Sequence, residues 1–90
     1  MKPPRTMREW GGGYVRCGVD LYSRVARLPA GTVFVVEHAN EITFHLESVP
    51  CERCGISLVV TVKGQRRRQV LEWLGTELPA SRDVLPEVGA

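Results

Sequence analysis

The sequence predicts a mainly β domain: a small bent antiparallel sheet or barrel of four to five strands, with one short C-terminal helix. Apolar and polar residues alternate in several short segments, as they do in strands with one buried face. Turn residues separate these segments at short intervals, which is typical of small all-β folds. The 90 residues (10.0 kDa) are enough for a single domain, and 43% hydrophobic with 24% charged residues is a globular composition. This composition excludes a membrane span, a fibre and a large enzyme, and it disfavours a wholly disordered chain.

The chain divides into three parts. Residues 1–13 contain two prolines, a glycine triplet and no periodicity, which predicts a flexible N-terminal arm whose Trp10 could dock on the domain. The small β domain with its C-terminal helix is expected over residues 14–76. Residues 77–90 contain Pro79 and Pro86 and are interpreted as a tail.

Alternation predicts strands near 19–25, 32–38, 41–47 and 55–63. The last of these has the clearest period of two. After Gly64 the period changes, because Val70, Leu71, Trp73 and Leu74 fall at helical spacing and Gly75 follows at the usual stop position. This predicts a short helix near 65–74.

Ala39-Asn40 is interpreted as the two-residue loop of a hairpin. That loop pairs Val35 with Phe44 and Phe34 with His45, and it places Val33, Val35, Phe44 and Leu46 together on one face while leaving Phe34 half-exposed. Under this register His38 and His45 lie roughly 13 Å apart, at about 3.3 Å per residue, too far to share a metal.

The segment Arg27-Leu28-Pro29-Ala30-Gly31-Thr32, followed by a valine-rich strand, resembles the first hairpin of small Src-homology-like or Tudor-like barrels. The resemblance implies a small barrel fold and names no ligand.

Pro50-Cys51-Glu52-Arg53-Cys54-Gly55 resembles a zinc knuckle, in which two cysteines chelate a metal from one tight turn. A closed structural zinc site needs four ligands, and one knuckle supplies two. The candidate set is Cys17, His45, Cys51 and Cys54, with zinc as the possible cofactor. The alternative is that Cys51 and Cys54 are reduced thiols in a Pro/Gly turn, with Cys17 a small apolar residue and His45 a solvent-facing strand residue.

The net charge is +2, but basic residues are concentrated in segments 1–27 and 63–68 on either side of an acidic hairpin. Lys63, Arg66, Arg67 and Arg68 follow one another without an acid, at a position where a helix N-terminus disfavours cations. Together with Tyr22 and Arg24 they are the candidate partner-binding residues. The alternative for the arginine run is a solvated basic turn.

No catalytic constellation is recognised, since the Gly11-Gly12-Gly13 triplet lacks the spacing and the lysine of a phosphate loop. The chain is therefore expected to be a cytoplasmic non-enzyme that binds a larger protein or nucleoprotein complex and no membrane. Its size and charge pattern are similar in style to phage or mobile-element accessory proteins, which implies a regulator or inhibitor of a host polymerase or CRISPR-type defence complex. The alternative is a small barrel, zinc-stabilised or metal-free, that binds nucleic acid directly through segments 1–27 and 63–68.

Overall fold

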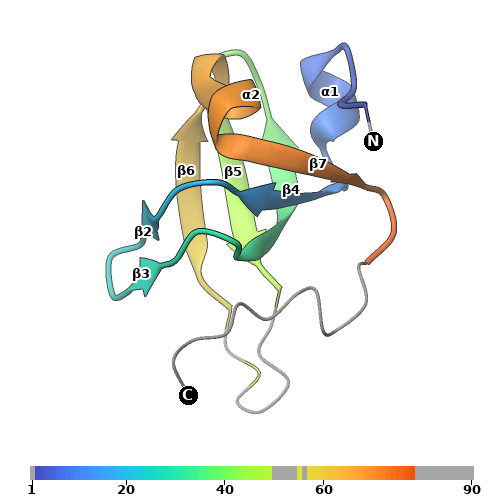
Figure 1. Ribbon diagram of the computed structural model, residues 1–90. Helices are drawn as coiled ribbons and strands as arrows, with labels where there is room; N and C mark the ends of the chain where they lie inside the picture. Colours follow the sequence, from blue (N-terminus) through green and yellow to red (C-terminus); the bar gives the residue numbers. More distant parts are fainter. Residues whose placement is uncertain (1, 50–54, 56, 79–90) are drawn as a thin grey trace.

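The computed structural model describes residues 2–49, 55 and 57–78, which form mainly β structure (Figure 1). The elements in chain order are α1 (Met7–Trp10), β1 (Tyr14–Cys17), β2 (Leu21–Tyr22), β3 (Arg27–Leu28), β4 (Val33–Ala39), β5 (Thr43–Ser48), β6 (Val59–Lys63), the 3₁₀ turn η1 (Gly64–Arg66), α2 (Arg67–Val70) and β7 (Leu71–Gly75). Within this part of the chain, no helix is long and apolar enough to cross a membrane.

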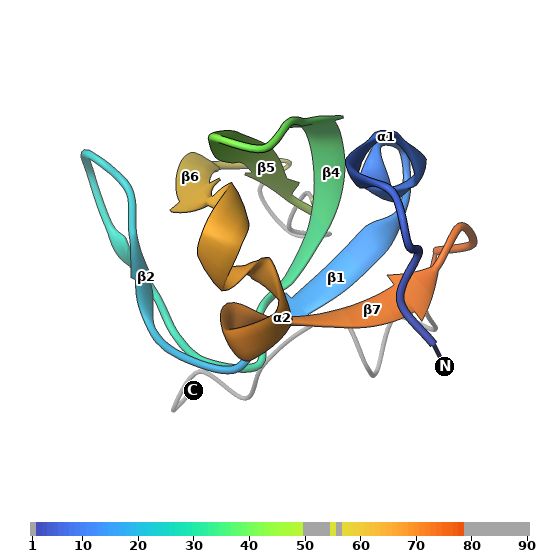
Figure 2. The same cartoon turned by 90° about the horizontal axis from the view of Figure 1, so that it is seen from above.

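Five strands form one antiparallel sheet in the order β6-β5-β4-β1-β7, and β2 and β3 pair with each other in a second, two-stranded sheet. Viewed from above, the sheet is strongly curved, and η1 and α2 cross from β6 to β7 on the open side of the curve (Figure 2). The predicted fold class, a mainly β domain built on a small bent antiparallel sheet, is confirmed.

The core lies on the concave face of this sheet and is centred on three aromatic rings. Trp10 is fully buried and makes edge-to-face contacts with Phe44 and Trp73, at centroid distances of 5.4 and 5.3 Å. Residues 7–10, inside the predicted flexible arm, thus form a helical turn that delivers Trp10 to the core.

The predicted register of the β4–β5 hairpin is wrong. Phe34 pairs with Ser48 and His38 pairs with His45, because the connecting turn is longer than two residues and a bulge interrupts β4 between Val36 and His38. Phe34 and Val36 are fully buried, so Phe34 is a core residue and not a half-exposed one.

The single strand predicted over 19–25 is also wrong, since this stretch forms β2 and a turn that leads into β3. β4 pairs with β1 as well as with β5, and β1 is a strand that the sequence did not predict. Its residues Val15 and Cys17 are buried. Gly13 precedes it and lies under Trp73, where a Cβ atom would overlap the indole ring.

The helix predicted over 65–74 is one turn long and ends at Val70. Leu71, Trp73 and Gly75 are buried in alternation with Glu72 and Leu74, which is the pattern of a strand. This strand, β7, pairs with β1 and completes the sheet on that side. The spacing of the apolar residues from 70 to 74 is compatible with both a helix and a strand. The segment forms a strand because it pairs with the edge of β1.

Candidate interaction surface

The base of the β2–β3 hairpin is attached to the domain through Asp20 and Leu28. The Asp20 carboxylate accepts hydrogen bonds from the Ala30 backbone N–H (2.9 Å) and from the Arg27 guanidinium (3.1 Å). Leu28 is 8% exposed and belongs to the core. The hairpin is therefore held at its base, although only two residue pairs join its strands.

The tip of the hairpin is a turn that exposes large side chains. The Ser23 hydroxyl accepts hydrogen bonds from the backbone N–H groups of Val25 (3.2 Å) and Ala26 (3.0 Å), which fixes the turn. Tyr22 and Val25 are 72% and 79% exposed, and Arg24 between them is exposed as well. The structure thus brings the predicted residues Tyr22 and Arg24 together on one tip and adds Val25, which the sequence reasoning missed.

The run Lys63–Arg68 forms the end of β6, η1 and the start of α2. Lys63, Arg66 and Arg68 are exposed, but Arg67 is half-buried and donates from Nη1 to the Gly64 carbonyl at 2.8 Å. Arg67 therefore stabilises its own turn. Because α2 has only four residues, the expected conflict between these arginines and a helix dipole is small.

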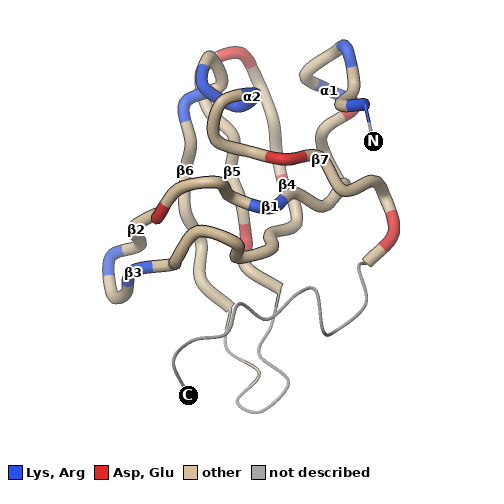
Figure 3. Tube along the Cα trace, viewed as in Figure 1, with Lys and Arg blue, Asp and Glu red and all other residues tan. Residues whose placement is uncertain are grey.

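The hairpin and the basic turn lie on the same side of the molecule as β6, the turn at the end of β6 and the hairpin standing apart from that strand (Figures 1 and 2). Colouring by charge shows basic positions on both, with further basic positions near α1 at the same end as the turn (Figure 3). The two groups of predicted partner-binding residues thus share one side of the molecule.

The predicted zinc set does not assemble as a whole. Cys17 is 1% exposed in the core, where its thiol donates to the Pro29 carbonyl at 3.3 Å, and burial raises its pKa. His45 alternates with the buried residues Phe44 and Leu46 and so lies on the opposite, outer face of the sheet. Cys17 is therefore removed from the set.

Cys51 and Cys54 lie outside the described residues, and the knuckle stays a prediction. Among the residues that are described, no group of three or more His, Cys, Asp or Glu side chains is arranged to hold a metal ion.

A second cluster, which the sequence reasoning missed, occupies the outer face of β4 and β5. His38 and His45 face each other across the two strands with ring centroids 5.9 Å apart and ring planes at 50°. The expected separation of roughly 13 Å is wrong, because it rested on the wrong register. The bulge in β4 exposes Glu37 and His38 consecutively, so that both lie beside His45.

Glu37 and Glu47 share this face and interact with each other. A side-chain hydrogen bond with Glu47, and then repulsion by its charge, raise the pKa of Glu37, while His45 acts in the opposite direction. The hydrogen bond with Glu37 lowers the pKa of Glu47, and so does the Ser57 hydroxyl, which donates to Glu47 Oε1 at 2.7 Å. One carboxyl of the pair thus holds its proton more strongly than the other.

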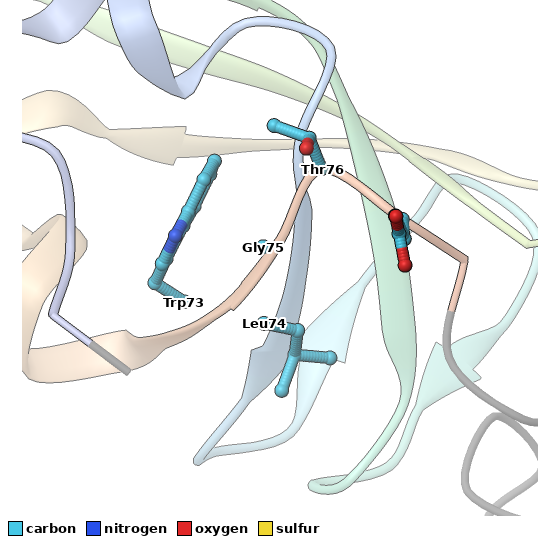
Figure 4. A pocket seen from close by; sticks show the side chains of 5 residues that line it. Trp73, Leu74, Gly75 and Thr76 are labelled. Atoms are coloured by element: carbon cyan, nitrogen blue, oxygen red, sulfur yellow. The ribbon is translucent and has the colours of Figure 1, made fainter.

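An open pocket of about 310 Å³ follows the last strand and is lined by Trp73, Leu74, Gly75, Thr76 and Glu77 (Figure 4). The Trp73 ring and the Leu74 side chain project away from each other, as neighbours in a strand do. The polar side chains of this lining are those of Thr76 and Glu77, and the remainder is apolar or glycine.

In comparisons with known proteins, no family model matches this chain, and neither a curated protein nor a solved structure matches it.

Proposed function

We propose that this chain is a non-catalytic interaction domain that binds a larger protein assembly through the tip of its β2–β3 hairpin. The observation that carries the proposal is the exposure of Tyr22 and Val25, at 72% and 79%, beside Arg24 on a turn that internal hydrogen bonds hold in shape. Tyrosine and arginine are enriched where binding energy is concentrated in protein interfaces. A turn that is fixed before binding loses little conformational entropy on association.

The curved antiparallel sheet, with a hairpin in the connection between β1 and β4, supports the proposed likeness to Src-homology-like or Tudor-like barrels. A small domain of this kind, with no enzymatic function of its own, would act as a regulator or inhibitor by covering a surface of a host polymerase or CRISPR-type complex. The partner would present an apolar pocket rimmed by acidic groups, because the tip combines Tyr22 and Val25 with Arg24.

Affinity capture from a nuclease-treated lysate of the source organism tests this proposal. The full chain, a Tyr22→Ser/Val25→Ser variant and a Thr76→Ala variant are immobilised in parallel. Thr76 is a matched control because it is exposed directly after β7, at the edge of the sheet opposite to β6. A partner retained by the full chain and by Thr76→Ala but lost by the hairpin variant supports the proposal. A partner that all three retain equally contradicts it.

Direct nucleic-acid binding is the second candidate, and the exposed residues Lys63, Arg66 and Arg68 favour it. Each phosphate neutralised on B-DNA contributes about 0.9 to the slope of log affinity against log salt. Replacing these three residues by Gln should therefore lower that slope by about 2–3, as measured by fluorescence anisotropy with a labelled duplex. Arg67 is left unchanged because it stabilises the turn. An unaltered slope removes this candidate.

A further inference from the structure

The outer face of the β4–β5 hairpin holds both histidines of the chain. They are seven residues apart in the sequence and become direct cross-strand neighbours because of the register of this hairpin and the bulge in β4. His38 is exposed and His45 is half-buried, so both imidazoles can be reached from solvent.

The spacing of the two rings fits coordination of one metal ion. With metal–nitrogen bonds of about 2.0–2.1 Å and tetrahedral angles, the centroids of two imidazoles on one ion lie about 5 Å apart. The observed distance of 5.9 Å exceeds this by less than about 1 Å, and the planes are tilted by 50° rather than stacked. A small rotation of the two side chains is enough to close the difference.

We propose that His38 and His45 form a binding site for one divalent transition-metal ion, with water completing the coordination. Imidazole is a ligand suited to zinc, nickel and copper, and carboxylates of neighbouring residues add negative charge that attracts a dication. Glu37 and Glu47 supply that charge on the same face. With two protein ligands, the site keeps open positions that a donor group of a partner can fill.

This site differs from the zinc set predicted around Cys51 and Cys54, although both would use His45. The predicted set would also use the two thiolates, whereas the protein ligands of this site are imidazoles alone, so substitution of the cysteines distinguishes the two. Removing one of the two protein ligands should lower the metal affinity by at least about tenfold. Even the loss of a residue that only hydrogen-bonds to a metal ligand lowers metal affinity by about 10–100-fold.

Calorimetric titration of the full chain with zinc chloride tests the proposal. The proteins compared are the unaltered chain, Cys51→Ser/Cys54→Ser, and that double variant combined with His38→Gln, His45→Gln or Thr61→Ala. Thr61 on β6 is the cross-strand neighbour of His45 and has no imidazole, so Thr61→Ala is the matched control. Long-range nitrogen–proton NMR spectra follow the two imidazole rings directly, because the chain contains two histidines and no other imidazole signals overlap with theirs.

The expected result is one zinc site that survives the cysteine changes and Thr61→Ala, weakens at least about tenfold in each histidine variant, and shifts both imidazole signals. Loss of all binding in Cys51→Ser/Cys54→Ser overturns the proposal, and so does undiminished binding by His38→Gln. Circular dichroism of each variant shows that it is folded, which is expected because both positions face solvent.

Discussion

The two hairpins of this chain differ in what holds them in place. The β4–β5 hairpin is paired over most of its length and contributes Phe34, Val36, Phe44 and Leu46 to the core, all fully buried. The β2–β3 hairpin has two residue pairs and exposes its tip. Short isolated hairpins are marginal in water, so the second one depends on contacts at its base. The β4–β5 hairpin is therefore the scaffold hairpin, and the β2–β3 hairpin is the presenting hairpin, which exposes its side chains to solvent.

Phe44→Ala would have the largest effect, because it removes a fully buried ring from the scaffold hairpin and from its contact with Trp10. The free energy of unfolding should fall by about 3–5 kcal/mol, as measured by urea denaturation. Thr43→Ala, one position away on the outer side of β5, should be near neutral. Equal losses in both variants would mean that the ring is not a core residue.

Gly13→Ala tests how closely the scaffold is packed. A Cβ atom at this position would overlap the Trp73 ring, and the forced displacement should lower the free energy of unfolding by about 1–3 kcal/mol. Gly11→Ala is the matched control, since a Cβ there meets nothing closer than the Arg8 carbonyl at 3.4 Å. A thermal melt of Gly13→Ala that overlays that of Gly11→Ala would contradict the close contact.

Asp20→Ala removes the attachment of the presenting hairpin. The global free energy of unfolding should change by less than about 1 kcal/mol, since the ion pair with Arg27 is exposed. The Ala30 amide, which donates to Asp20, should exchange its hydrogen faster than in the parent chain. Unchanged exchange at Ala30 would show that other contacts hold the base of the hairpin.

Tyr22→Ser/Val25→Ser should have the smallest effect on stability, within about 0.5 kcal/mol, because both side chains already lie in water. Chemical denaturation measures this in the same protein used for affinity capture. A large loss of stability would mean that the tip packs against the domain, and the variant could then not report on partner binding.

The parts of the fold that local pattern controls were predicted from the sequence. Val60 and Val62 are buried in alternation with Val59, Thr61 and Lys63, and β6 lies inside the predicted strand 55–63. Phe44 and Leu46 in β5 follow the same rule. In these strands one face is apolar and the other polar, so the sequence determines the orientation directly.

The errors arose where pairing with a distant strand decided the outcome. The stretch 71–75 became a strand because it pairs with the edge of β1, and β1 itself is a short segment between Gly13 and Gly18. The bulge in β4 places His38 opposite His45, and no local feature of the sequence indicates this bulge. The histidine cluster was missed for that reason, whereas Tyr22 and Arg24 were found because exposure in a turn is a local property.

The pairing of β1 with β7 has a consequence for how the protein acquires its structure during synthesis. Residues 14–17 pair with β4 on one side, but their partner on the other side is residues 71–75, and Trp10 packs on Trp73 at 5.3 Å. This edge of the sheet therefore joins segments some 60 positions apart. Contacts of such long range make folding slow relative to helical domains of the same size. On the ribosome, β4, β5 and β6 can pair as they emerge, but β1 has an open edge until residue 75 is exposed. Nascent chains stalled before β7 should therefore be sensitive to protease and bind chaperones, and those released after it should resist.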